Sequence, residues 1–266
     1  MKIFPNNKTK FFLSISTKPG NTGSKFHNTL YRYFDMNCLY FPLKVKNVSS
    51  IKKILIDFNI AGCSVSMPFK KLVINKVNKL DKSAFLTKNI NTILNKKNKL
   101  IGYNTDYFAA LKIFSKKIKK KNGIVILGDG AVARTLYIAL KKLKFKNIFL
   151  CSRKKRYQDW NLKNNDKIIN WNERNNLKTN TLVNATPIGM SHLNYLPIKK
   201  PSLKNFNNIV DLTINSNNKL KKVSNKLKIK YIDGYEFALN QALKQFKIYT
   251  QKKIDTKTVK KVLKVN

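Results

Sequence analysis

The stretch ILGDGAVAR, residues 126–134, restricts the fold of this 266-residue chain more than any other part of its sequence. A strand-like apolar run at 124–127 leads directly into Gly128, Gly130 and Ala133, and a helix-like run follows. The first glycine allows a tight turn, the second lets a pyrophosphate approach the backbone, and the small residue at 133 permits close packing of helix on strand. The stretch therefore predicts a Rossmann-type unit with a dinucleotide site; an ordinary tight turn is the alternative.

The next strand-like run ends at Cys151 without the carboxylate that usually holds the ribose 2′-hydroxyl of NAD. A basic run follows instead, and Arg153 can hold a 2′-phosphate through charge-assisted hydrogen bonds. We therefore expect NADP(H) as the cofactor, with a basic turn in a basic protein as the alternative. Asp129 would repel phosphate unless its side chain points to solvent. The expected cofactor contacts in these two segments are Gly128, Asp129, Gly130, Ala131, Val132, Ser152, Arg153, Lys154, Lys155 and Arg156.

Along most of the chain, apolar runs of strand length alternate with amphipathic runs of helix length, which is typical of an α/β protein with parallel sheets. In the first region we expect strands at 11–16, 38–44 and 61–65 and a helix at 47–58. A second region begins after Lys120. Its expected strands are NGIVILG, KNIFLCS, TLVNA, NIVDLT and KIKYID, and further helices are expected at 106–121, 131–143, 235–250 and 256–265.

The charge balance does not by itself indicate a nucleic-acid-binding protein. The chain has 55 Lys+Arg against 12 Asp+Glu, a formal net charge of +43, but the lysines are spread through every segment and interleaved with Asn and Ile. This pattern is typical of drift in an A+T-rich genome, and a selected polyanion-binding surface is the alternative. We expect no specific nucleic-acid partner, only non-specific binding at low salt.

Cysteine usage and hydropathy indicate a soluble, cytoplasmic protein without a metal. Cys38, Cys63 and Cys151 have no metal-like spacing and cannot all pair, so we expect reduced thiols. The N-terminus has no apolar core of signal-peptide length, and no uncharged apolar run reaches the ~18 residues that a membrane helix needs.

Three short pieces stand out in the first region: SMPFK (66–70), NINTI (89–93) and GYNTD (102–106). Lys70 follows a strand and Pro68, and we expect it in the first turn of a helix, where a cation is electrostatically disfavoured. Asp106 is one of only 12 acidic residues in the chain, so it is a stronger indication of a functional site than any single lysine. It can also be read as the N-cap of the following helix.

These pieces resemble motifs of the shikimate dehydrogenase family, and the resemblance covers nearly the full length in the same order. SVSMPFK is similar to the family's N-V-T-V-P-x-K, NINTI to its A-V-N-T-L, and GYNTD to its G-x-N-T-D. CSRKKR resembles N-R-T-x-x-R/K, the segment that meets the NADP 2′-phosphate. NATPIGM matches almost letter for letter, and the segment from Asp233 to Gln241 resembles the late D-G-x-x-M-L-x-x-Q.

The resemblance implies a reversible, NADPH-dependent reduction of 3-dehydroshikimate to shikimate, a step of chorismate and aromatic amino acid biosynthesis. It implies that Lys70 is catalytic and that Asp106 is its partner, because the oxyanion left by hydride transfer needs a proton donor and nearby positive charge. It also implies that Leu212 and Gly234 lie by the nicotinamide. The substrate contacts it implies are Asn21, Gly23, Ser66, Asn91, Asp106, Ile214 and Gln241.

We therefore expect two α/β domains in a monomer or homodimer. Residues 1–105 would form the substrate-binding catalytic domain, residues 106–235 a Rossmann-type NADP-binding domain with a parallel sheet, and the helices of 236–266 would return to the first domain. A small-molecule substrate is the expected partner.

The chain departs from the family pattern at several positions. Asn21 and Gly23 stand where the family has two serines that hold the substrate carboxylate, and Ile214 stands where a substrate-contacting tyrosine is common. Ser152 replaces the asparagine of N-R-T, and Glu236 replaces the second glycine of the late motif. Two alternatives follow: a quinate/shikimate dehydrogenase with altered substrate preference, and a non-catalytic basic relative that binds nucleic acid.

Overall fold

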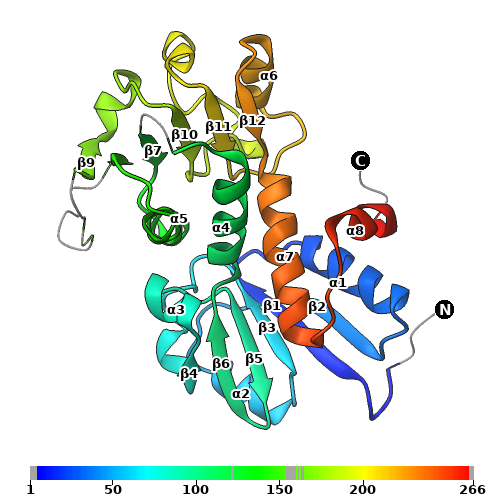
Figure 1. Cartoon of the computed structure of the whole chain (residues 1–266). Helices are drawn as coiled ribbons and strands as arrows, with labels where there is room; N and C mark the ends of the chain where they lie inside the picture. The colour runs from blue at the N-terminus through cyan, green and yellow to red at the C-terminus, as the bar shows by residue number, and fades with distance from the viewer. Residues whose placement is uncertain (1–4, 121–122, 154–159, 161, 163–164, 264–266) are drawn as a thin grey trace. The chain divides into compact units, whose positions relative to one another are not determined.

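The computed structural model describes residues 5–120, 123–153, 160, 162 and 165–263, which belong to two compact units. The terminal unit comprises Met1–Phe108 and Leu239–Asn266, and the central unit comprises Ala109–Ala238. Each unit is built around a six-stranded sheet (Figure 1). The chain passes from one unit to the other within the helices α4 (Thr105–Lys117) and α7 (Gly234–Thr250).

The sheet of the terminal unit is mixed, in the order β2-β1-β3-β5-β6-β4. β1 runs parallel to β2 and β3, the three strands that the sequence predicts, but β5, which the sequence analysis did not predict, runs antiparallel to β3 and β6. Only Lys97 and Asn98, with φ of 51° and 62°, join β5 to β6, and so short a connection requires antiparallel strands. The strands are β1 (Lys10–Ser16), β2 (Cys38–Lys44), β3 (Gly62–Val65), β4 (Lys79–Leu80), β5 (Thr92–Lys96) and β6 (Lys99–Tyr103).

An aromatic cluster ties the C-terminal helices to this sheet. Phe246 of α7 and Val259 of α8 are fully buried in the same core as Phe12 of β1. The rings of Phe12 and Tyr249 lie 4.8 Å apart, which fixes the far end of α7 against the sheet. The helices of this unit, besides the adjoining parts of α4 and α7, are α1 (Thr22–Tyr33), α2 (Ile51–Asp57), α3 (Lys82–Thr87) and α8 (Thr256–Leu263).

The run after Pro68 is not the helix that the sequence predicts. It forms consecutive turns and a single short 3-10 helix, η1 (Ile74–Lys76), and backbone groups at its start and end pair with other segments of the chain. The Lys70 carbonyl accepts from the Ile90 N–H at 2.9 Å, and the run ends in β4, which pairs with β6. Val73 is fully buried in the core. Lys70 therefore lies in a packed turn and not at a helix N-terminus, so the electrostatic argument made for it does not hold.

The sheet of the central unit is entirely parallel, in the order β12-β11-β10-β7-β8-β9. Numbered from β7, this is the order 3-2-1-4-5-6 of a doubly wound dinucleotide fold, with its topological switch between β7 and β10. The strands are β7 (Ile124–Leu127), β8 (Ile148–Ser152), β9 (Lys167–Asn170), β10 (Thr181–Asn184), β11 (Asn208–Asp211) and β12 (Lys230–Ile232). The connecting helices are α5 (Ala131–Lys142) and α6 (Lys219–Lys226), with the short 3-10 helices η3 (Trp171–Asn175), η4 (Ser191–Leu193) and η5 (Pro201–Asn205).

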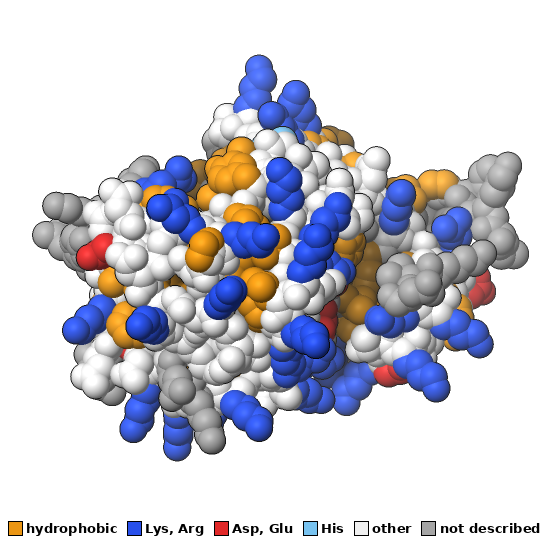
Figure 2. Space-filling view, turned by 90° about the horizontal axis from the view of Figure 1, so that it is seen from above, with side chains coloured by type: hydrophobic (Ala, Val, Ile, Leu, Met, Phe, Trp, Pro, Cys, Tyr) orange, Lys and Arg blue, Asp and Glu red, His pale blue; other side chains and the backbone are white. Residues whose placement is uncertain are grey.

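Positive side chains cover much of the face seen in Figure 2. They are spread across that face, and several of them lie close together near the middle of its lower half. Among the described residues, no helix is long and apolar enough to cross a membrane. Within the same residues, no group of three or more His, Cys, Asp or Glu side chains is placed to hold a metal ion.

Candidate active site

Lys70 and Asp106 form a short, largely buried ion pair. The Lys70 Nζ donates to Asp106 Oδ2 at 2.6 Å, and the two side chains are only 14% and 8% exposed. Lys70 comes from the turns after β3, and Asp106 comes from the first turn of α4. An acidic side chain in a first helical turn is favourable for the helix itself, because it lies at the positive end of the helix dipole. The pair holds an ammonium group in a fixed position, as a proton donor requires.

Asn104, and not Asp106, caps α4. The Asn104 Oδ1 accepts from the Tyr107 N–H at 3.3 Å, and its Nδ2 donates to Thr87 Oγ1 at 2.8 Å. The alternative interpretation of Asp106 as the N-cap is therefore wrong. Since the neighbouring asparagine satisfies the helix end, the Asp106 carboxylate is left to bind Lys70.

A second polar group is built from Asn91 and Gln241. The Asn91 Nδ2 donates to Gln241 Oε1 at 3.3 Å, while the Asn91 Oδ1 accepts from the Thr105 N–H at 2.8 Å and from Thr92 Oγ1 at 2.9 Å. Gln245 donates to Thr92 Oγ1 at 2.8 Å. Since the Asn91 oxygen faces hydrogen-bond donors and its nitrogen faces the Gln241 oxygen, an acceptor, the orientation of the Asn91 amide group is determined. Thr92, Thr105 and Gln245 are supporting residues that sequence reasoning missed, because their role is visible only from the contacts they make.

A serine at Gly23, as in the family pattern, would crowd the side chain of Tyr40. A Cβ built on Gly23 would lie 3.1 Å from both the Cε1 and the hydroxyl oxygen of Tyr40. The Tyr40 hydroxyl donates to Ser64 Oγ at 2.5 Å, and Tyr40 is only 2% exposed. Ser64 of β3 is half-buried, and the exposed Ser66 follows just after the end of this strand. Ser64 is a polar residue of this region that the sequence analysis did not select, and Asn21 is exposed just before α1.

The glycine-rich turn leads from β7 into α5. Gly128 has φ of +108°, and a Cβ there would lie 3.1 Å from the Ala185 carbonyl oxygen, so the turn needs glycine. A Cβ on Gly130 would meet nothing within 4 Å, and Ala133 is fully buried. The space above Gly130 and the first-turn N–H groups of α5 at Ala131 and Val132 fit the pyrophosphate of a dinucleotide.

Asp129 does not point away into solvent. Its Oδ2 accepts from Ser152 Oγ at 2.6 Å, which joins the turn to the end of β8. Arg153 follows and is exposed, with its guanidinium 6.0 Å from the centre of the Trp171 ring. The other basic cofactor contacts expected here, Lys154, Lys155 and Arg156, lie outside the described residues.

The residues expected by the nicotinamide come together at the carboxyl end of β11. A Cβ on Gly234 would lie 2.2 Å from the Thr213 carbonyl oxygen and 2.9 Å from the Leu212 carbonyl carbon, so these backbones touch only because residue 234 is glycine. Ile214 is 41% exposed beside them. Glu236, which replaces a family glycine, pairs with Lys117 at 2.6 Å.

Asp211 organises the loops at this end of the sheet, although the sequence analysis did not select it. Its buried carboxylate accepts hydrogen bonds from the side chains of Asn184, Asn218, Thr213 and Tyr231. Burial raises the pKa of the Asp211 carboxyl, and the hydrogen bonds oppose that rise. The network fixes the backbone next to Leu212 and Thr213.

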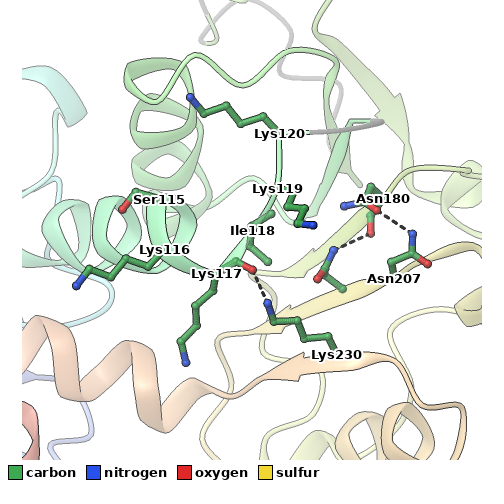
Figure 3. Close-up of a pocket in the computed structure, with 10 residues that line it drawn as sticks. Ser115, Lys116, Lys117, Ile118, Lys119, Lys120, Asn180, Asn207 and Lys230 are labelled. Atoms are coloured by element: carbon green, nitrogen blue, oxygen red, sulfur yellow. Dashed lines mark hydrogen bonds between the residues drawn. The ribbon is translucent and has the colours of Figure 1, made fainter.

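A pocket of about 920 Å³ lies at the other end of the central sheet, where its strands begin (Figure 3). It is lined by the end of α4 and by residues that precede or begin β10, β11 and β12, including Asn180, Asn207 and Lys230. The Lys230 Nζ donates to the Lys117 carbonyl at 2.6 Å. Ligands of open α/β sheets bind at the carboxyl ends of the strands, so this pocket at the amino ends is not the dinucleotide site.

Comparison with known proteins identifies relatives of the whole chain. A family model described as the shikimate dehydrogenase substrate binding domain matches residues 22–93. A shikimate dehydrogenase-like protein of Haemophilus influenzae is 32% identical over 192 residues, covering 70% of this chain and 68% of the relative. The shikimate dehydrogenase (NADP(+)) of Clostridium beijerinckii is 28% identical over 242 residues, covering 88% of both chains.

The fold leads to the same group of proteins. The crystal structure of a shikimate dehydrogenase in complex with NADP+ superposes with a TM-score of 0.86, at 25% identity, covering 99% of this chain and 98% of the other. Sequence likeness over most of the chain and fold likeness over nearly all of it thus agree, and the chain belongs to the shikimate dehydrogenase family.

Proposed function

We propose that this protein is an NADP-dependent shikimate dehydrogenase that reversibly reduces 3-dehydroshikimate to shikimate in chorismate and aromatic amino acid biosynthesis. The observation that carries the proposal is the 2.6 Å contact between Lys70 Nζ and Asp106 Oδ2 in a largely buried setting. Family membership supports it, since relatives that align over most of the chain are named shikimate dehydrogenase (NADP(+)).

The chemistry assigned to the chain is proton transfer and charge stabilisation. NADPH, when bound, supplies the hydride. Lys70 donates the proton to the carbonyl oxygen as negative charge develops there, and its positive charge stabilises that oxygen. Asp106 holds the Lys70 ammonium in place through the 2.6 Å contact. In the reverse direction the same pair accepts the proton of the hydroxyl.

The substrate hydroxyls are assigned to Ser66, Asn91, Asp106 and Gln241. Asn91 and Gln241 contact each other at 3.3 Å and are uncharged, so they orient a polyol without adding charge. Near Gly23, Ser64 and Asn21 remain as polar groups for the substrate carboxylate, and Ile214 is an apolar contact. We assign residues 1–105 and 236–266, together with Asp106 at the start of the following segment, to substrate binding and catalysis.

The cofactor is assigned to residues 106–235. Gly128, Gly130 and the start of α5 receive the pyrophosphate, and Leu212 and Gly234 border the nicotinamide. Arg153 holds the 2′-phosphate that distinguishes NADP from NAD. The open space at Gly130 and the parallel sheet order support this assignment.

The proposed partners are the small-molecule substrate and no specific nucleic acid, in a monomer or homodimer. The spread of lysines through every segment of the sequence supports the absence of a selected polyanion site. We further propose a cytoplasmic location. The free, buried thiols of Cys38, Cys63 and Cys151 agree with it, since thiols persist in a reducing compartment.

Quinate is the second candidate substrate, because Gly23 lacks one carboxylate-binding serine of the family pattern. A Cβ built on Gly23 would lie 3.1 Å from the Tyr40 ring and hydroxyl, so this end of the site differs in shape and polarity from the family pattern. The deciding experiment compares initial rates for shikimate and quinate, each with NADP+ and with NAD+. We expect the highest kcat/KM for shikimate with NADP+. A higher value for quinate would replace the proposed substrate, and no turnover of either would overturn the proposed function.

A further inference from the structure

We propose that Asp129 binds the adenosine ribose of the dinucleotide and weakens the preference of this protein for NADP over NAD. This inference rests on the proposed function and adds a specificity-determining residue to its cofactor site.

The backbone of the central sheet brings Asp129 to the end of β8. β7 and β8 are parallel neighbours with Leu127 opposite Cys151, and the Gly128 N–H donates to the Cys151 carbonyl at 2.8 Å. The following residues of the two segments therefore lie side by side. Ser152 Oγ donates to Asp129 Oδ2 at 2.6 Å, and Ser152 is only 7% exposed. A well-packed hydroxyl therefore holds the carboxylate at the carboxyl end of β8.

A carboxylate in this place has a known chemical use. In doubly wound dinucleotide folds, an acid at the end of the second strand accepts a hydrogen bond from the ribose 2′-hydroxyl of NAD. In this chain the strand ends in Ser152, which has no charge, but that serine holds a carboxylate supplied by the glycine-rich turn. The contact with Ser152 uses Oδ2 only, and a carboxylate has further acceptor sites on both oxygens. Asp129 can therefore accept the ribose hydroxyl in place of the missing acid.

Asp129 and Arg153 favour opposite cofactors. The exposed Arg153 guanidinium attracts a 2′-phosphate, whereas the Asp129 carboxylate repels it and binds a 2′-hydroxyl. With both charges at the end of β8, NADP+ binds through Arg153 and NAD+ retains a binding mode through Asp129. The ratio of the two affinities then depends on Asp129.

The test is calorimetric titration of NADP+ and NAD+ into the unaltered protein and the variants Asp129→Asn and Asp57→Asn. Asp57 is an exposed carboxylate of the terminal unit, and its variant changes net charge equally. For Asp129→Asn we expect about tenfold weaker NAD+ binding and unchanged or tighter NADP+ binding, because a charge-assisted hydrogen bond is lost and a repulsion is removed. Asp57→Asn should leave the ratio of the dissociation constants unchanged.

A ratio within twofold of the unaltered protein in Asp129→Asn would overturn the inference while leaving the proposed function intact. Equal weakening of both cofactors, together with a lower melting temperature, would assign Asp129 a purely structural role and would also overturn it. If the unaltered protein bound neither dinucleotide, the proposed function would fall together with this inference.

Discussion

At the scale of single residues, the ion pair between Lys70 and Asp106 has a structural cost as well as a chemical use. Both side chains are largely withdrawn from water, and burying charges is expensive unless each is paired and hydrogen-bonded. Their contact at 2.6 Å supplies that pairing. A chain with 12 acids that keeps one of them in such a position is consistent with a functional requirement for the pair.

Asp106→Asn should lower kcat by about tenfold or more, because the neutral amide holds the Lys70 ammonium less firmly. The amide keeps the shape of the carboxylate, so the loss should appear in kcat at saturating shikimate while the fold is retained by circular dichroism. Asp57→Asn is the matched control. Full activity of Asp106→Asn would show that the carboxylate does not support Lys70.

Gly23→Ser should not strengthen substrate binding, although it restores the residue that the family carries. The new side chain would meet the Tyr40 ring and hydroxyl at 3.1 Å, and overpacking of this kind costs about 1–3 kcal/mol. We expect a melting temperature lower by several degrees and no decrease in KM for shikimate. A several-fold lower KM with unchanged melting temperature would contradict this account of Tyr40.

His27 should make stability depend on pH. Burial lowers its pKa from 6.5 to about 4, an effect only partly opposed by the hydrogen bond with Gln245 at 3.0 Å. The unfolded chain then binds more protons between these values, so stability is lost as the pH falls from about 6.5 towards 4. By pH 5 the expected loss from this group is about 2 kcal/mol.

Urea unfolding of the unaltered protein and of His27→Gln at pH 7 and pH 5 measures this contribution. The variant should lose about 2 kcal/mol less than the unaltered protein between the two pH values, because glutamine does not titrate. An equal loss in both proteins would mean that His27 is not buried in its neutral form.

At the scale of secondary-structure elements, the start of α4 decides where Asp106 lies. Asn104 caps the helix and is fixed in turn by Thr87, so the first turn that carries the carboxylate is held from two sides. Asp255 caps α8 in a similar way, with its Oδ1 accepting from the Thr258 N–H at 2.9 Å. Asp255 is exposed, and its side-chain hydrogen bonds go to Thr258 and not to the residues around the ion pair.

Asn104→Ala should therefore lower both the unfolding free energy, by about 1 kcal/mol, and kcat, whereas Asp255→Ala, which removes the cap of α8, should lower only the unfolding free energy. Urea unfolding and steady-state rates on both variants separate the two effects. If both variants lost kcat to the same degree, the α4 cap would have no special connection with the active site.

The elements were not equally predictable. The strand–turn–helix around Gly128 could be read from the sequence, because glycine spacing and apolar runs are local signals. The run after Pro68 could not, since its helix-like spacing is overridden by backbone pairing of Lys70 with Ile90. The β5–β6 hairpin was missed because Lys97 and Asn98 form its turn in place of the usual Asn-Gly pair.

Within the site, sequence motifs selected Lys70, Asp106, Asn91 and Gln241, and the structure brings them together in two contacting pairs. The supporting contacts of Tyr40 and Asp211 were beyond sequence reasoning, because nothing local distinguishes a buried tyrosine or aspartate that faces a functional segment. The roles of these residues in binding and catalysis stay proposals.

At the scale of the whole molecule, a net charge of +43 is the dominant physical property. Scattered charge of this size should attract any polyanion by counterion release, without a defined site. We expect DNA binding at about 50 mM salt that is lost by about 200 mM and is identical for unrelated sequences. Fluorescence anisotropy with two unrelated duplexes measures it, and tight sequence-dependent binding at physiological salt would favour a nucleic-acid function instead.

The central claim is that one lysine among many is catalytic, and turnover of shikimate with NADP+ by Lys70→Ala and Lys71→Ala tests it most directly. Lys71 is the exposed neighbour of Lys70 and carries the same charge, so it controls for position and net charge. We predict that Lys70→Ala lowers kcat by about a hundredfold or more, while Lys71→Ala stays within about twofold of the unaltered protein. Equal effects of the two substitutions would contradict the account.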